Sequence, residues 1–208
     1  MPIVVLVGNK GGAGKTTLAV NLAMALARRA NTLLLDADPQ GSSLQWLAMA
    51  EGHALPDVMD PQQDLVAQVR ELSQRYKNIV VDCPPSVQAP QTHAALQVCD
   101  LAIIPVQPSP VDLWATVHIQ QAIEQAKRTN PKVSAWLVIN QLEARTTLSR
   151  LVRDAVEEID LPVARTAIRR RAIYRSSALE GKSVFDTGSR GAAAVAELNQ
   201  LIEEVFPS

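Results

Sequence analysis

The chain carries near its N-terminus a glycine-rich segment suited to phosphate binding, Gly8-Asn9-Lys10-Gly11-Gly12-Ala13-Gly14-Lys15-Thr16-Thr17. Glycines let backbone N–H groups surround a phosphate without interference from a Cβ, and the helix that follows adds the positive end of its dipole. The pattern predicts a P-loop in which Lys15 contacts the β- and γ-phosphates, Thr16 binds Mg²⁺ and Thr17 contacts the α-phosphate. Asn9 stands where the strict P-loop pattern has glycine.

Two acidic motifs follow apolar runs further along the chain. They are Asp36-Ala37-Asp38-Pro39-Gln40 and Asp82-Cys83-Pro84-Pro85. Asp36 and Asp38 alternate on an extended chain and therefore lie on one face. Asp82 is typical of the Walker B carboxylate, which holds Mg²⁺ through its water shell. A single aspartate at a strand end is equally typical of a turn or a helix cap, but three motifs in this order favour a nucleotide site.

Short apolar runs rich in β-branched residues alternate with amphipathic stretches, which predicts strands alternating with helices. Strands are predicted at Ile3–Val7, Thr32–Leu35, Asn78–Val81, Leu101–Val106 and Ser134–Ile139. Helices are predicted at Thr16–Arg29, Leu65–Arg75, Val111–Lys127 and Leu148–Ile159. This order is typical of an α/β fold, doubly wound, with a mostly parallel sheet and helices on both faces. Ligands of such folds bind at the carboxyl ends of the strands, where the three motifs lie.

The length of 208 residues and the lack of a linker or repeat predict a single domain, residues 1–208. Glu51–Pro61 is expected to be a surface loop because of its glycine and prolines. The first strand begins almost at the N-terminus, so we expect no N-terminal helix-turn-helix domain.

The composition excludes a disordered, collagen-like or disulfide-rich chain, because 47% of the residues are hydrophobic and there are two cysteines. Cys83 and Cys99 stand in apolar surroundings, which favours reduced core thiols. The sequence has neither a signal-peptide pattern nor an apolar run of about 18 residues, so we expect a soluble cytoplasmic protein.

Together the motifs resemble the ParA/MinD family of deviant Walker ATPases, and more closely its short ParA members that partition DNA. The resemblance rests on the P-loop with its second lysine, Lys10, on the two acidic motifs and on Asp100–Val106. It implies an ATPase with ATP and Mg²⁺ as cofactors. It also implies that Lys10 reaches across a homodimer to the partner's nucleotide, that Asp38 positions the attacking water and that Asp36 supports the metal end of the site. We expect hydrolysis to be slow.

The predicted site residues fall into three groups. The catalytic residues are Lys10, Lys15 and Asp38, and the metal site comprises Thr16, Asp36 and Asp82. The nucleotide-binding residues are Lys10, Gly11, Gly12, Ala13, Gly14, Lys15, Thr16, Thr17, Pro108 and Asn140. The segment Asn140-Gln141-Leu142-Glu143 faintly resembles the guanine reader of GTPases, but the family resemblance favours adenine, with Asn140 offering its amide to the ring and Pro108 packing nearby.

Half of the 20 basic residues lie between positions 145 and 190. The stretch 161–179 has no acidic residue, and the candidate cations are Arg165, Arg169, Arg170, Arg171, Arg175 and Lys182. They predict a footprint for the phosphate backbone of duplex DNA, and a solvated face is the alternative. The resemblance to ParA proteins also implies that an ATP-bound dimer binds DNA without sequence preference.

The sequence therefore predicts a ParA-type ATPase that lies on the nucleoid and segregates plasmids or chromosomes. A small centromere-binding protein of the ParB type is its expected partner. Two alternatives keep the ATPase, one bound to a membrane like MinD and one positioning a protein cargo. The C-terminal stretch has an apolar stripe but carries Glu197, Glu203 and Glu204, which anionic lipid repels. We therefore expect this helix to pack on the core, without membrane contact.

Overall fold

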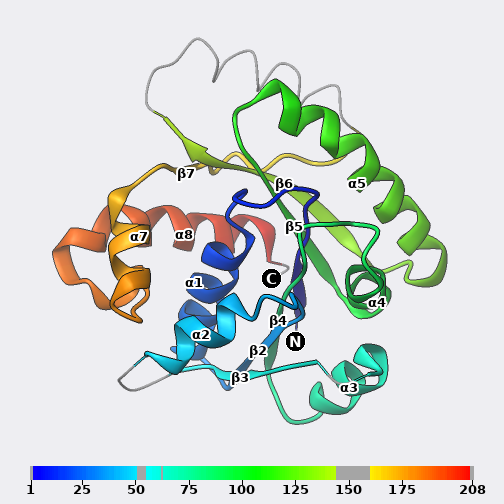
Figure 1. Ribbon diagram of the computed structural model, residues 1–208, viewed down its shortest axis with the longest axis horizontal. Helices are drawn as coiled ribbons and strands as arrows, with labels where there is room; N and C mark the ends of the chain where they lie inside the picture. Colours follow the sequence, from blue (N-terminus) through cyan, green and yellow to red (C-terminus); the bar gives the residue numbers. More distant parts are fainter. Residues whose placement is uncertain (1, 51–54, 62, 144–159, 207–208) are drawn as a thin grey trace.

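The computed structural model describes residues 2–50, 55–61, 63–143 and 160–206. These residues contain a seven-stranded sheet of order β3-β2-β4-β1-β5-β6-β7 (Figure 1). Every pairing between its strands is parallel. The strands are β1 (Ile3–Leu6), β2 (Thr32–Asp36), β3 (Asp57–Met59), β4 (Asn78–Asp82), β5 (Leu101–Val106), β6 (Ser134–Leu142) and β7 (Ile168–Arg169). The expected α/β class with a parallel, doubly wound sheet is confirmed.

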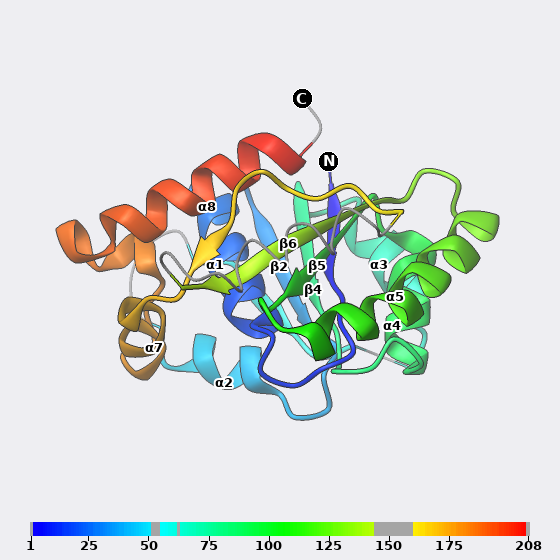
Figure 2. The same cartoon turned by 90° about the horizontal axis from the view of Figure 1, so that it is seen from above.

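Helices cover both faces of the sheet (Figure 2). One face carries α1 (Lys15–Ala27), α2 (Ser42–Ala48), α7 (Ala172–Leu179) and α8 (Ala192–Val205). The other face carries α3 (Leu65–Leu72), α4 (Pro90–Val98) and α5 (Pro110–Thr129). Two short 3-10 helices, η1 (Val184–Asp186) and η2 (Gly188–Gly191), connect α7 to α8.

The sheet separates two hydrophobic cores. Val4 and Leu6 of β1 belong to the core beneath α1 and α8, whereas Val5 and Val7 belong to the core beneath α3, α4 and α5. Successive side chains of a strand point to opposite faces, so a strand covered on both sides has to be apolar throughout. This is why continuous apolar runs predict the central strands correctly.

The segment after α2 differs from its prediction. Glu51–Pro61 is predicted to be a loop, yet Asp57–Met59 within it form the edge strand β3, which pairs with β2. The Tyr76 hydroxyl donates a hydrogen bond to Asp57 Oδ2 across 2.6 Å and holds the strand in place. A strand of three residues is too short to show an alternation of apolar and polar residues in the sequence. Its extended conformation depends on its pairing with the neighbouring strand β2.

Strand β6 runs past its predicted end at Ile139 to Leu142. The extension carries Asn140 and Gln141 to the carboxyl edge of the sheet. The helix predicted at Leu148–Ile159 lies outside the described residues.

The C-terminal helix α8 packs on the core, as expected. Its buried side chains are Ala194, Leu198, Leu201, Ile202 and Val205. Glu204 is drawn toward the protein as well, since its carboxylate accepts hydrogen bonds from the backbone N–H groups of Arg165 and Thr166. Within the described ranges, no helix combines the length and the apolar character needed to cross a membrane.

Candidate nucleotide-binding site

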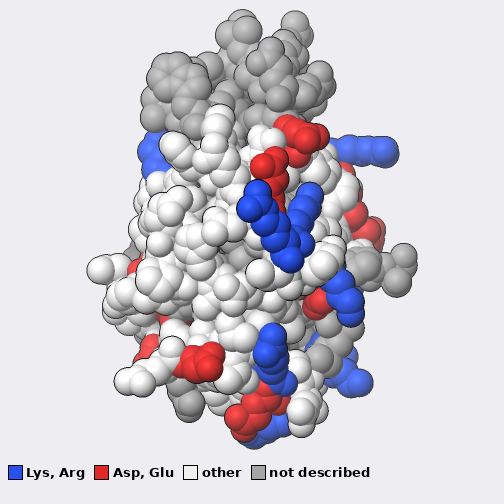
Figure 3. Space-filling model, turned by 90° about the vertical axis from the view of Figure 1, so that its right-hand side faces the viewer, with Lys and Arg blue, Asp and Glu red and all other residues white. Residues whose placement is uncertain are grey.

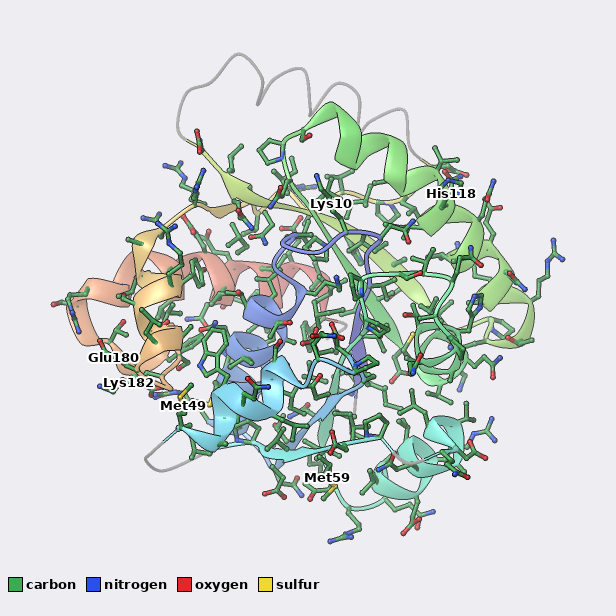
Figure 4. The ribbon with its side chains drawn as sticks, viewed as in Figure 1. Lys10, Met49, Met59, His118, Glu180 and Lys182 are labelled. Atoms are coloured by element: carbon green, nitrogen blue, oxygen red, sulfur yellow. The ribbon has the colours of Figure 1, made fainter. Side chains whose placement is uncertain are left out.

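The three motifs predicted from the sequence meet at the carboxyl edge of the sheet. Strands β2, β4 and β1 are neighbours, and Asp36 and Asp82 are direct partners in the pairing of β2 with β4. Leu6 is the partner of Asp82 in the pairing of β1 with β4, and the glycine-rich loop follows Leu6. Figure 4 shows Lys10 on this loop, between β1 and α1.

Three side-chain amides hold the carbonyl groups of the loop. Gln107 Nε2 and Gln141 Nε2 donate to Gly12 O at 2.7 and 2.8 Å, and Asn140 Nδ2 donates to Ala13 O at 2.7 Å. In a trans peptide the N–H group points away from the carbonyl group of the same peptide plane. The N–H groups of Ala13 and Gly14 are therefore directed away from these amides, toward the side where an anion can bind.

Two glycines of the loop have conformations that favour glycine. Gly12 and Gly14 have φ angles of 81° and 94°. A Cβ at Gly14 would lie 2.2 Å from Asn140 Nδ2, whereas a Cβ at Gly11 or Gly12 would meet nothing within 4 Å. The loop is thus tightly packed against Asn140 and open at its turn.

The two lysines of the loop differ in burial. Lys15 is 6% exposed, and its Nζ donates to Lys10 O across 3.1 Å. Burial lowers the pKa of Lys15, while the charges of Asp82 and Asp38 oppose that change. Lys10 is exposed, and it borders a small cavity beside the end of β5 and helix α5.

The Asp82 carboxylate is completely buried. Ser43 Oγ donates to its Oδ2 across 2.6 Å, and within the described ranges Oδ1 has no hydrogen-bond partner. Burial raises the pKa of Asp82 to about 6, and hydrogen bonds from Ser43 and Thr16 act in the opposite direction. The structure therefore places Lys15 and Thr16 close to Asp82.

Asp36 and Asp38 have different surroundings. Asp36 is buried, and its Oδ1 and Oδ2 accept hydrogen bonds from the backbone N–H groups of Asp38 and Leu44 at 3.3 and 3.0 Å. Burial raises the pKa of Asp36. Asp38 is half-buried, and its Oδ1 accepts from Gln40 N across 3.0 Å. Asp36 thus organises the loop that carries Asp38 toward Lys15.

These residues fit a triphosphate with Mg²⁺. The loop offers N–H groups and an open turn, Lys15 supplies a buried positive charge, and Asp82 Oδ1 is a buried hard ligand that accepts no hydrogen bond from the described residues. In the part of the chain that the structure describes, no group of three or more His, Cys, Asp or Glu side chains could hold a metal by itself.

A cavity of about 150 Å³ adjoins the loop. It is lined by residues of the first turns of α1, by Asn140 and Gln141, and by residues of β7 and α7 that include Tyr174. Asn140 lies there as expected, although its amide nitrogen is bonded to Ala13 O. Pro108 is not among the residues that line the cavity.

Three of the predicted DNA-binding arginines have acidic partners that are distant in sequence, although the stretch 161–179 itself contains no acidic residue. Arg170 pairs with Glu143 across 2.7 Å, and Arg171 pairs with Glu197 across 2.5 Å. Arg169 lies 3.8 Å from Glu197. Arg165, Arg169, Arg170 and Arg175 are exposed, whereas Arg171 is half-buried.

Lys182 is separated from the P-loop. It pairs with Glu180 across 2.9 Å, and Figure 4 shows both residues at the end of α7, away from Lys10. On the face toward α4 and α5, basic and acidic side chains of the described residues lie next to each other and do not form one basic patch (Figure 3).

Sequence reasoning missed four residues of this site: Ser43, Gln107, Gln141 and Tyr174. The sequence indicates Gln141 only through the weak resemblance to GTPases. Gln107 directly follows Asp100–Val106 and Ser43 lies three residues after Gln40, so their positions after strand ends were the available signal. Tyr174 had no local signal that separated it from a core aromatic residue.

A family model described as the CobQ/CobB/MinD/ParA nucleotide binding domain matches residues 4–184. The maintenance of carboxysome distribution protein A of Halothiobacillus neapolitanus is 41% identical over 202 residues, which cover 96% of this chain and 94% of that protein. The sporulation initiation inhibitor protein Soj of Bacillus subtilis is 24% identical, with coverage of 94% and 96%.

Solved structures share the fold. Apo McdA from Cyanothece has a TM-score of 0.82 and 17% identity, with 98% of both chains covered. The septum site-determining protein MinD from Pyrococcus horikoshii, complexed with Mg-ADP, has a TM-score of 0.73 and 20% identity, with coverage of 97% and 96%.

Proposed function

We propose that this chain, which belongs to the CobQ/CobB/MinD/ParA family of nucleotide-binding domains and is an ATPase of the ParA/MinD type, distributes carboxysomes in the cell. The observation that carries the proposal is the 41% identity, over 96% of the chain, to a protein named for the maintenance of carboxysome distribution. Soj is 24% identical. Positioning of a protein cargo is therefore better supported than the segregation of DNA that we expected from the sequence.

ATP and Mg²⁺ are the cofactors of this ATPase. We assign the phosphates to Lys15 and to the N–H groups of the loop from Gly11 to Gly14. Thr16 and Asp82 are assigned to the metal, because Asp82 Oδ1 is buried and accepts no hydrogen bond from the described residues. Mg²⁺, when bound, neutralises charge on the β- and γ-phosphates.

Asp38 is assigned to positioning of the attacking water. It is half-buried and close enough to Lys15 for its charge to oppose the lowering of that lysine's pKa by burial. Asp36 does not contact the metal directly in this assignment, since its two oxygens accept hydrogen bonds from the backbone N–H groups of Asp38 and of Leu44 in α2. It supports the metal end of the site indirectly, by fixing the backbone around Asp38.

Lys10 is assigned to the nucleotide of a second subunit. Its exposure on the loop gives the ammonium access to a partner. A positive charge supplied to the phosphates by another subunit accelerates hydrolysis by about 10³- to 10⁵-fold in GTPases. The smaller end of that range applies here, because an ammonium is a point charge without the planar fork of arginine. ATP occupancy and dimerisation then become coupled, so that ATP shifts the population toward the dimer.

The ATP-bound dimer uses duplex DNA as a track in this proposal. The exposed cations Arg165, Arg169, Arg170, Arg175 and Lys182 supply phosphate contacts, although several of them share their charge with a nearby acid. Arg171 has a structural role because Glu197 holds it. A small adaptor protein links the dimer to the cargo and stimulates hydrolysis.

The proposal is tested by deleting the gene in cells that carry a fluorescent carboxysome shell protein. We expect evenly spaced carboxysomes to collapse into clusters, and the wild-type gene to restore the spacing. A Lys15→Ala gene should fail to restore it. The matched control is the retention of plasmids and of a chromosomal marker, which should stay unchanged.

The second candidate is segregation of DNA, which is favoured by the alignment with Soj over 94% of the chain. Normal carboxysome spacing together with loss of plasmids or misplaced chromosomes would favour this candidate and contradict the first. Membrane association like that of MinD is less well supported, because the apolar side of α8 is buried in the core.

A further inference from the structure

Two glutamine side chains from different segments of the chain meet at one carbonyl group of the P-loop. Gln107, which follows β5, donates through Nε2 to Gly12 O across 2.7 Å, and Gln141, near the end of β6, donates to the same oxygen across 2.8 Å. A carbonyl oxygen has two lone pairs, so these two bonds use its acceptor capacity fully. The orientation of the Gly12 carbonyl is therefore fixed by both side chains.

Gln141 makes this contact from an unfavourable backbone conformation. Among the described residues it is the one non-glycine residue with a positive φ, 57°. Residues with a Cβ adopt this left-handed region at a cost in free energy, and they stay there only where surrounding contacts hold them. The pairing of β6 with β7 is irregular at the same place, since it moves from Asn140 to Leu142 on β6 while it advances by one residue on β7. Gln141 is thus the extra residue of a β-bulge.

The bulge directs two consecutive side chains to the same loop. In a regular strand, Asn140 and Gln141 would point to opposite faces of the sheet. Here the Asn140 amide donates to Ala13 O and the Gln141 amide donates to Gly12 O, so the two side chains reach adjacent peptide groups of the P-loop. Bulges are over-represented next to active sites, where they re-aim side chains.

We propose that Gln107 and Gln141 are positioning residues for the phosphates, which act by holding the peptide group between Gly12 and Ala13 in the orientation that a phosphate requires. The carbonyl of this peptide points to the two amides, so its N–H group, which belongs to Ala13, points to the opposite side. The loop then has its anion-binding shape before the nucleotide arrives, and less binding free energy is lost in ordering it. The proposal rests on the proposed function, because it takes the phosphates of ATP as the ligand of this N–H group.

A direct contact with the base is the competing role for Gln141, because this residue also lines the cavity beside the loop. The two roles differ in the part of the nucleotide that they affect. A positioning residue of the loop acts on the phosphates, whereas a base contact has no effect on a ligand that has no base. Inorganic tripolyphosphate therefore distinguishes them.

The test replaces each glutamine by leucine, which has a side chain of similar size without a hydrogen-bond donor. Gln107→Leu, Gln141→Leu and the double variant are compared with Gln68→Leu. Gln68 is the matched control, because it is also a half-buried glutamine and its Nε2 donates to a carbonyl group, that of Asp60, across 3.4 Å beside the edge strand β3. Calorimetry measures the dissociation constants of ATP and of inorganic tripolyphosphate, each with Mg²⁺.

Each single substitution in the pair should weaken ATP and tripolyphosphate by the same factor, about two- to tenfold. The double variant should weaken both ligands by more than the product of the two single factors, because in each single variant the remaining amide still holds the carbonyl. Gln68→Leu should change neither dissociation constant.

A fourth variant separates phosphate binding from stability. Gln141→Gly also lacks the amide, but glycine adopts a positive φ without the cost that a side chain brings. It should therefore bind tripolyphosphate as weakly as Gln141→Leu and yet have a higher melting temperature than that variant. A purely structural role for Gln141 would make affinity and melting temperature change together.

The proposal is overturned if the double variant binds tripolyphosphate like the wild type, if ATP alone is weakened, or if the affinities of the variants follow their melting temperatures. Binding of ATP by the wild type without binding of tripolyphosphate would also overturn it, since a preformed loop binds phosphates without a base. Failure of the wild type to bind ATP would instead contradict the proposed function.

Discussion

The hydroxyl of Ser43 donates a hydrogen bond to Asp82 Oδ2 across 2.6 Å, and both residues are fully buried. The next residue, Leu44, donates its backbone N–H to Asp36 Oδ2 across 3.0 Å. The first turn of α2 therefore holds both strand-end carboxylates. Because Ser43 engages one oxygen of Asp82, the other oxygen would be available to support Mg²⁺ through its water shell.

The hydrogen bond from Ser43 should set the affinity for the metal. Ser43→Ala removes a charge-assisted bond that fixes the carboxylate, so the Mg²⁺ concentration needed for half-maximal ATP binding should rise about tenfold. A titration of ATP binding against Mg²⁺ measures this change. Ser42→Ala is the matched control, because Ser42 is exposed on the same turn and should leave the titration unchanged.

The carboxylate of Asp82 should destabilise the nucleotide-free protein. Its pKa is raised to about 6 in the folded state, so the folded protein binds more protons than the unfolded chain between about pH 4 and pH 6. The free energy of unfolding therefore falls as the pH rises through this interval. Asp82→Asn should reduce this fall, of which the raised pKa of Asp36 supplies a further part, and should raise the free energy of unfolding at pH 7.5 by up to roughly 3 kcal/mol.

Urea unfolding at pH 5 and pH 7.5 without nucleotide checks this prediction. Asp60→Asn is the control, since Asp60 is exposed and its replacement should change stability by less than about 0.5 kcal/mol. A lower stability of Asp82→Asn at pH 7.5 would show that the buried charge is compensated in the free protein.

Gly14 should not tolerate a side chain. Gly14→Ala combines a left-handed backbone with a Cβ 2.2 Å from Asn140 Nδ2, and the strain alone costs about 1 to 3 kcal/mol. We expect ATP affinity to fall at least about tenfold in equilibrium binding. Gly188→Ala shares the positive φ but meets nothing within 4 Å, so it should keep ATP affinity. Equal effects of the two variants would argue against the packing of Gly14 on Asn140.

Replacement of two arginines from the stretch 161–179 should have different effects, one on stability and one on DNA binding. Arg171→Ala leaves Glu197, whose side chain is 13% exposed, without its ion pair to that arginine, so the melting temperature should fall. Arg165→Ala removes an exposed charge and should reduce the slope of log K against log salt for duplex DNA by about 0.9 for each phosphate that is no longer neutralised. Thermal unfolding measures the melting temperature of Arg171→Ala. Filter binding to duplex DNA over a range of salt, in the presence of ATP, measures the slope for Arg165→Ala. An unchanged slope for Arg165→Ala would exclude this residue from the DNA interface.

Local patterns were sufficient to predict the parts of the protein that depend on local physics. The central strands are apolar throughout because both faces are covered, and the P-loop is recognisable because phosphate binding requires glycines and Lys15 at fixed spacing. The same holds for Asp82 at the end of β4.

Contacts between distant segments could not be predicted in this way. Glu197 is 26 residues from Arg171, so a count of acids near the arginines missed the ion pair. Ser43 meets Asp82 only because β2 and β4 are neighbours, and Asn140 meets the P-loop only because β6 extends beyond Ile139. Strand β3 depends on its pairing with β2, which no local signal reveals.

The coupling of ATP to dimerisation through Lys10 is the central claim, and sedimentation velocity tests it most directly. Asp38→Ala, which should bind ATP but hydrolyse it slowly, is compared with Asp38→Ala/Lys10→Ala and with Asp38→Ala/Lys132→Ala. Lys132 is exposed beyond the end of α5 and serves as the control. With ATP and Mg²⁺, the single variant and the Lys132 control should sediment as dimers, whereas the Lys10 variant should sediment as a monomer. An ATP-dependent dimer of the Lys10 variant would contradict the account.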